Sequence, residues 1–229
     1  MDNALSSDVI ESTVLNSISD YDSEIIIRKE HGGKKEITKV STNTTMLCHL
    51  PQGKEFIIGD LNFVKLETFK NGTTMILYSP HYSPHLTYSY GVNRSYPDSY
   101  VRSYLHKEIL PIIENNIGAL YIKPHYTDYT TLKKENGVIS DAYSEKSLIF
   151  ERIGLLSYYD YVKYMELIPE ECRFGLLSNR YDSPNDFVLT LRSGAVRMAR
   201  GYENKLVNAV ITVDSSRIVK TRVLSTYSV

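Results

Sequence analysis

Apolar residues recur every four positions in one stretch of this chain, which is the spacing of one face of an α-helix. The four residues are Val101, Leu105, Ile109 and Ile113. Ser95 is suited to cap this helix. We expect the helix to run over Pro97–Asn115, and Pro111 to kink or end it, because proline removes a backbone donor and clashes with the preceding turn.

A second helix is predicted over Tyr158–Leu167, because Ser157 and Asp160 have the spacing of a capping box. Elsewhere short apolar runs alternate with turn signals such as Gly59-Asp60 and Asn71-Gly72. The expected strands are Glu55–Ile58, Leu61–Leu66, Thr73–Tyr78 and a hairpin over Phe187–Val196 that turns at Ser193-Gly194. The pattern therefore predicts an α+β fold, with two helices on short, mainly antiparallel strands.

The first 45 residues differ from the rest, because their apolar residues occur in pieces too short to fold alone. One piece is a short amphipathic stripe, and Glu24–Arg28 is predicted as an isolated strand. We expect residues 1–45 to be an N-terminal docking arm and linker, and residues 46–229 to form the main domain. The arm residues expected to bind a partner, in cis or in trans, are Val9, Ile10, Val14, Ile18, Ile25 and Ile27.

Several motifs in a fixed order resemble a domain family of unassigned function, found in bacterial surface proteins and phage proteins. The motifs are Ser99–Leu105, Ile153–Ser157, Phe174–Ser178, Leu189–Val196 and Leu206–Val213. The resemblance implies a C-type-lectin-like fold, shared with the formylglycine-generating enzymes. The chain departs from the family in having no tryptophan, and in having Asn208-Ala209 where an arginine-proline pair often stands.

Composition narrows the class of protein. The 229 residues carry a formal net charge of −1, which argues against a nucleic-acid partner. No apolar stretch approaches the ~18 residues of a membrane span, so membrane insertion is not expected. The N-terminus lacks the features of a signal peptide. The two cysteines, Cys48 and Cys172, are far apart, and we expect two buried thiols without a disulfide.

Tyrosine is unusually frequent, with 19 residues against 6 phenylalanines. Exposed tyrosines make good recognition surfaces for proteins or sugars, so Tyr82, Tyr88 and Tyr90 are expected partner-binding residues. The alternative is that tyrosine replaces buried tryptophan, which we favour for Tyr100 and Tyr104.

We find no catalytic, cofactor or metal pattern that favours an enzyme. His81 and His85 have the spacing of a helical metal pair, but Pro80 and Pro84 preclude a regular helix there. Pro184-Asn185-Asp186 resembles only weakly the calcium-ligating tripeptides of C-type lectins. Cys172 lacks the second cysteine that formylglycine-generating enzymes use.

Arginine residues are expected to have structural roles. The arginine of the helix motif is Arg102, whose planar guanidinium suits a tie to strand carbonyls or to a carboxylate. Arg192, Arg197 and Arg200 stand near the last hairpin, where a solvated edge is the common arrangement.

These observations favour a non-enzymatic bacteriophage virion protein, a capsid or tail component assembled in the host cytoplasm. It would display a lectin-like domain for assembly or host-surface attachment. The expected partners are other virion proteins, further copies of the chain and host-surface carbohydrate. The alternative is a bacterial ligand-binding protein or enzyme with a formylglycine-generating-enzyme-like fold.

Overall fold

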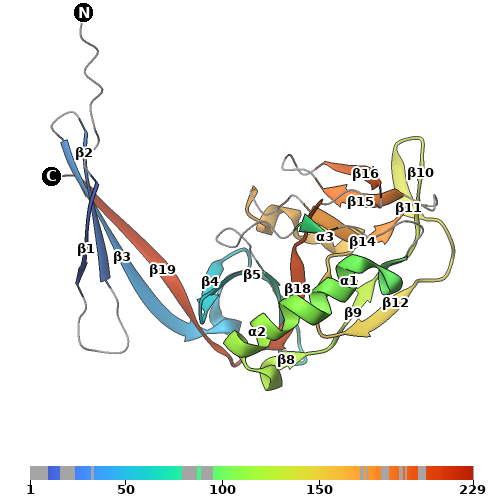
Figure 1. Ribbon diagram of the computed structural model, residues 1–229, viewed down its shortest axis with the longest axis horizontal. Coiled ribbons are helices and arrows are strands. Elements are labelled where there is room, and N and C mark those ends of the chain that lie inside the picture. The colour runs from blue at the N-terminus through green and yellow to red at the C-terminus, as the bar shows by residue number, and fades with distance from the viewer. Residues whose placement is uncertain are drawn as a thin grey trace, which may run out of the picture. The chain divides into compact units, whose positions relative to one another are not determined.

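The chain divides into two compact units in a computed structural model (Figure 1). Unit 1 comprises Met1–Thr45 and Ile218–Val229, and unit 2 comprises Met46–Arg217. The C-terminal strand, which we expected in the 46–229 domain, is therefore grouped with the N-terminal segment. The structure describes residues 10–15, 24–31, 34–78, 87–88, 95–170, 173, 175–181, 186–190, 193, 195–200 and 205–228.

Unit 1 is a sheet in the strand order β1-β2-β3-β19. Its strands are β1 (Ile10–Leu15), β2 (Glu24–His31), β3 (Lys34–Met46) and β19 (Ile218–Ser228). The first three pair antiparallel in sequence order. Figure 1 shows the long strands β3 and β19 side by side.

The structure corrects one expectation for this unit. Glu24–Arg28, predicted as an isolated strand, belongs to β2, which is paired with β1 on one side and with β3 on the other. The physical reason is that short apolar segments satisfy their backbone groups in a ladder with one another.

The main sheet of unit 2 has the order β4-β5-β6-β18-β13, with β8 also paired to β18, and all of these pairs are antiparallel. The strands are β4 (Glu55–Ile58), β5 (Leu61–Thr68), β6 (Thr73–Tyr78), β8 (Ile122–Lys123), β13 (Gly154–Leu155) and β18 (Ala209–Asp214). Both predicted hairpin turns are confirmed: Gly59 and Gly72 adopt positive φ angles of 58° and 78°, which glycine tolerates best.

Four smaller antiparallel ladders complete the described strands of unit 2. They are β9 (His125–Asp128) with β12 (Leu148–Glu151), β10 (Leu132–Glu135) with β11 (Val138–Asp141), β7 (Thr87–Tyr88) with β17 (Lys205–Leu206), and β14 (Gly175–Arg180) with β15 (Asp186–Thr190) and β16 (Val196–Arg200). The predicted hairpin is present as β15 and β16, but its second strand begins at Val196, where the prediction ended it, and runs to Arg200.

The first predicted helix is present but interrupted. A 3-10 turn, η3 (Tyr96–Asp98), precedes α1 (Tyr100–Tyr104), a π-helical turn, η4 (Leu105–Ile109), and α2 (Leu110–Ile117). The wide π turn ends just before Pro111, which has no N–H for regular α-helical bonding. Ser99, not Ser95, caps α1 by accepting a hydrogen bond from the Arg102 backbone N–H at 3.1 Å. The four stripe residues are all buried, as predicted.

The second helix is α3 (Tyr158–Tyr164), continued by the 3-10 turn η6 (Met165–Leu167). The predicted capping box of Ser157 and Asp160 is present. Two further 3-10 turns are η1 (Leu47–His49) and η5 (Ala119–Tyr121). No described helix has the length and apolar character needed to cross a membrane.

The core joins α3 to the main sheet and to β14. Its members include Val64, Leu77, Tyr161, Leu177 and Val210. Leu132, in β10 between β9 and β11, also belongs to this core and is 0% exposed. The described fold is therefore α+β, with mostly antiparallel strands.

Candidate functional site

A buried carboxylate, Glu151, organises a polar cluster between the helices and the β9–β12 ladder. Its side chain is 1% exposed. One carboxylate oxygen, Oε1, accepts a hydrogen bond from the Tyr96 hydroxyl at 2.9 Å. The other, Oε2, lies 2.8 Å from Arg102 Nε and 3.0 Å from His106 Nε2. We call these four residues the Glu151 cluster.

The helix start brings the partners of Glu151 together. Tyr96 lies in η3, Arg102 in α1, and His106 four residues later in the π turn, so the last two lie on the same side of the helix. Arg102 Nη1 also donates to the Pro97 carbonyl at 3.2 Å. The predicted contact of Arg102 with a carboxylate is confirmed.

Arg152, the residue that follows the end of β12, extends this attachment to the second half of the helix. Arg152 forms an ion pair with Glu114 of α2 and donates to the Ala119 carbonyl at 2.6 Å. Two consecutive residues, Glu151 and Arg152, therefore hold α1 and α2 on either side of the π turn.

Glu151 stays ionised despite its burial. Desolvation alone would raise the pKa of its carboxyl, but hydrogen bonds, among them those from His106, Arg102 and Tyr96, outweigh burial and hold the pKa below its usual range. A carboxylate whose pKa is lowered is a weak proton acceptor. The arrangement therefore suits the fastening of the helix to the ladder better than proton transfer.

Three further residues lie close to the carboxylate. His125 stands opposite Glu151 in the β9–β12 register. A Cβ atom on Gly154 would lie 2.7 Å from Glu151 Oε1 and 2.3 Å from the Thr127 hydroxyl oxygen. Only glycine fits at this position, because any side chain would collide with both groups.

The sequence pattern gives no signal for Glu151. On β12 the apolar residues Leu148 and Phe150 are exposed, and the charged residue is buried, which is the reverse of the usual alternation. The pattern does not indicate His106 or Tyr96 either, because the role of each depends on a carboxylate about 50 residues away in the sequence.

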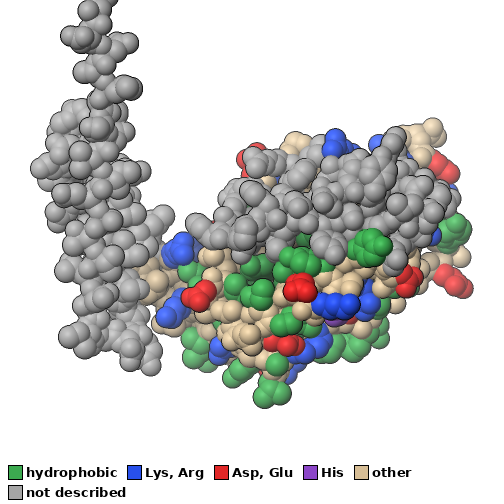
Figure 2. All heavy atoms as spheres, viewed as in Figure 1, with side chains coloured by type: hydrophobic (Ala, Val, Ile, Leu, Met, Phe, Trp, Pro, Cys, Tyr) green, Lys and Arg blue, Asp and Glu red, His purple; other side chains and the backbone are tan. Residues whose placement is uncertain are grey.

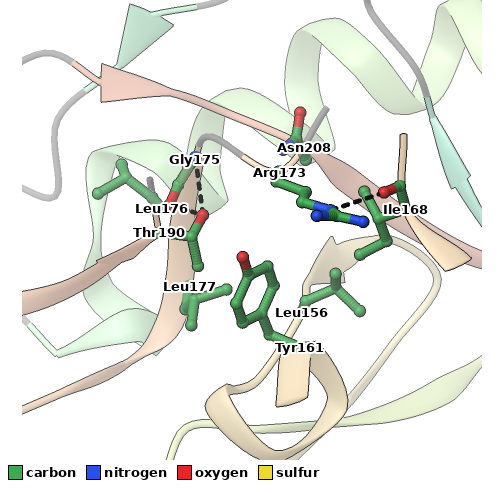
Figure 3. A pocket seen from close by; sticks show the side chains of 9 residues that line it. All are labelled: Leu156, Tyr161, Ile168, Arg173, Gly175, Leu176, Leu177, Thr190 and Asn208. Atoms are coloured by element: carbon green, nitrogen blue, oxygen red, sulfur yellow. Dashed lines mark hydrogen bonds between the residues drawn. The ribbon is translucent and has the colours of Figure 1, made fainter. Parts of the chain in front are cut away.

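The second candidate feature is a small cavity between α3 and the β14–β15 ladder (Figure 3). Leu156, Ile168 and Leu177 form apolar walls, and Tyr161, Arg173 and Thr190 add polar groups. Its volume of about 10 Å³ is room for a single water molecule at most. An organic ligand does not fit this space.

Five of the nine expected partner-binding residues lie in strands that the structure describes. Ile10 and Val14 lie in β1, Ile25 and Ile27 in β2, and Tyr88 in β7. Val9, Ile18, Tyr82 and Tyr90 lie outside the described residues.

Four other residues singled out in the sequence, two tyrosines, an arginine and a cysteine, lie in the described part of the chain. Tyr100 is 47% exposed, so its predicted burial is wrong: the stripe of Val101 and Leu105 faces the core, and Tyr100 precedes it on the helix. Tyr104 is half-buried and Arg197 is exposed. Cys48 is a free thiol of intermediate exposure. Four candidate positions lie outside the described residues: His81, His85, Cys172 and Arg192.

The described residues contain no group of three His, Cys, Asp or Glu side chains arranged to hold a metal ion. On the face shown in Figure 2, charged side chains of both signs are interspersed with hydrophobic ones. Comparison of the chain with protein-family models, with curated proteins and with solved structures gave no match. The family resemblance therefore rests on the residues of the chain alone.

Proposed function

We propose that this chain is a non-enzymatic assembly or attachment protein, of the kind that forms a bacteriophage capsid or tail component. Unit 1 would dock the chain onto other virion proteins or onto further copies of itself. Unit 2 would be the displayed domain, with a C-type-lectin-like fold and host-surface carbohydrate as a partner. The tyrosines expected to contact such a partner are Tyr82, Tyr88 and Tyr90.

The observation that carries this proposal is the register of β1 and β2. Val14 stands opposite Ile25, Ser12 opposite Ile27, and Ile10 opposite Lys29. Directly opposite residues of an antiparallel pair share one face of the sheet, and so do alternate residues of one strand. Four of the six apolar arm residues expected to bind a partner, Ile10, Val14, Ile25 and Ile27, therefore occupy a single face of the ladder.

The chemistry of unit 2 is consistent with a displayed domain. Glu151 is engaged by Tyr96, Arg102 and His106, and a carboxylate with these partners fastens elements together. The cavity beside Tyr161 is too small for an organic substrate. The Glu151 contacts therefore serve the fold of unit 2, and the cavity offers no room for a substrate.

Substitutions on the two faces of β2 test the proposal in the full chain. Ile25→Lys places a charge on the face shared with Val14, whereas the matched control Ile26→Lys places it on the opposite face, opposite Thr13 and Lys39. Light scattering should show an oligomer for the unmodified chain and for I26K, and a smaller species for I25K. An unmodified chain that is monomeric, or equal behaviour of the two variants, would contradict docking through this face.

The virion assignment has its own test. Mass spectrometry of purified phage particles from cells that carry the coding sequence should detect peptides of this chain at a fixed ratio to the major capsid protein. Detection in the soluble cell fraction, with none in the particles, argues for the bacterial ligand-binding alternative.

A further inference from the structure

The hydroxyl group of Tyr161 is buried and therefore needs a hydrogen-bond partner. The residue lies in α3, packs in the core and is 2% exposed. Among the described residues, no group lies within hydrogen-bond reach of its hydroxyl oxygen. Buried polar groups of proteins almost always have a hydrogen-bond partner, either a protein group or an ordered water.

The hydroxyl points into the cavity between α3 and the β14–β15 ladder (Figure 3). Thr190 lines the same cavity, and its hydroxyl accepts from the Gly175 N–H at 3.0 Å and lies 3.1 Å from the Gly175 carbonyl. Its oxygen still has capacity for a further donor. Arg173 lines the cavity from another side, with its Nε donating to the Ile168 carbonyl at 2.9 Å; the remaining guanidinium N–H groups are further donors.

The size of the cavity decides the class of ligand. A volume of about 10 Å³ corresponds to about one water-sized probe, and a buried water needs 2–4 polar partners. A purely apolar cavity of this size would stay dry. This one is lined by a hydroxyl with no partner among the described residues and by three further polar side chains, those of Arg173, Thr190 and Asn208.

We propose that the cavity is a binding site for one ordered water molecule, which the Tyr161 hydroxyl, Thr190 and Arg173 hold between helix α3 and the β14–β15 ladder. The water links the helix to the ladder through the Tyr161 hydroxyl, which makes no direct hydrogen bond to the described residues. This inference is independent of the proposed function, because it concerns only the interior of unit 2.

The direction in which Tyr161→Phe shifts the urea midpoint of unfolding tests the water site in the full chain. If a water satisfies the hydroxyl, Tyr161→Phe removes a hydrogen-bonded group, and the urea midpoint of unfolding shifts down. If the hydroxyl has no partner, the same variant removes a desolvated donor, and the midpoint shifts up. Tyr164→Phe is the matched control, because Tyr164 lies on the same helix and its hydroxyl bonds directly to Glu67. Its midpoint should also shift down.

A crystal structure of the unmodified chain provides a second, direct readout. The expected result is a single density peak within hydrogen-bond distance of Tyr161 Oη, which is absent in Y161F crystals. Three results would overturn the proposal: a Tyr161 hydroxyl bonded directly to a protein group, an anomalous signal in the cavity after a bromide soak, which would identify an anion, or an upward shift of the urea midpoint in Y161F.

Discussion

His125 of β9 and Glu151 of β12 stand directly opposite each other, and their side chains differ in hydrogen bonding. The carboxylate of Glu151 has three partners, whereas neither ring nitrogen of His125 has a hydrogen-bond partner among the described residues. Burial lowers the pKa of His125, although the charges of Glu151 and Asp160 act in the opposite direction. The imidazole is therefore neutral in the folded protein at neutral pH.

This relationship predicts a pH-dependent stability. Unfolded histidine has a pKa of about 6.5, so between this value and the lower folded pKa the unfolded chain binds more protons than the folded one. The free energy of unfolding should therefore fall as the pH drops below about 6.5. In His125→Phe, urea titrations between pH 7 and pH 5 should show a flatter dependence of the free energy of unfolding on pH than in the unmodified chain. Equal slopes in the two proteins would contradict the assignment to His125.

Removal of the Glu151 carboxylate should destabilise unit 2 strongly. Glu151→Ala leaves Arg102, His106 and Tyr96 without their acceptor, and loss of one member of a buried pair costs about 3 kcal/mol. Urea unfolding monitored by tyrosine fluorescence measures the change. Glu135→Ala is the control, because the Glu135 side chain is 69% exposed in its pair with Lys133, and it should change stability little.

Gly154→Ala should destabilise the same region through a steric clash. The new Cβ would lie 2.3 Å from the Thr127 hydroxyl oxygen, and such overpacking costs about 2 kcal/mol. Thr127→Ala removes that hydroxyl, so the double variant G154A/T127A should lose less stability than the sum of the two single changes. Strict additivity in the double-mutant cycle would show that the clash lies elsewhere.

Lys65 should be important for the turn that follows β3. Its Nζ donates to the carbonyls of Leu47 and Cys48 at 3.0 Å each and of Leu50 at 2.5 Å, and burial lowers its pKa. Lys65→Met removes all three bonds from a charged donor, with an expected loss of about 2 kcal/mol. Hydrogen exchange should rise selectively at residues 47–50. Exposed Lys70→Met is the control, and equal exchange in the two variants would contradict this role.

Unit 2 should fold without unit 1 when it is cut at both ends. The Leu47 N–H donates to the Arg217 carbonyl at 2.9 Å, and the Cys48 N–H to the Ser215 carbonyl at 3.0 Å, so the two ends of the unit are tied together. Deletion of residues 1–45 alone would leave β19 without its neighbour β3. We expect residues 46–217 to unfold cooperatively as a soluble monomer, and residues 46–229 to associate through the edge of β19 that β3 covers in the full chain. Size-exclusion chromatography and urea unfolding distinguish the two.

The sequence by itself determined the local elements. Two turn signals, Gly59-Asp60 and Asn71-Gly72, sufficed for the β4–β5 and β5–β6 hairpins. The capping box at Ser157 marked the start of α3, and the four-residue stripe marked the buried face of the first helix. Each of these features depends on residues within a few positions of one another, so a local sequence pattern is enough to predict it.

Only the tertiary structure decided where the buried polar groups lie and which distant strands pair. Glu151 and Lys65 are charged residues that a sequence pattern assigns to the surface, and both are buried by neighbours distant in sequence. The ring nitrogens of His125 are buried as well. The pairing of β19 with β3 likewise joins the two ends of the chain. A buried charge is stable only when hydrogen-bond or ion-pair partners lie beside it in the folded protein. A local sequence pattern does not indicate which distant residues will be those partners.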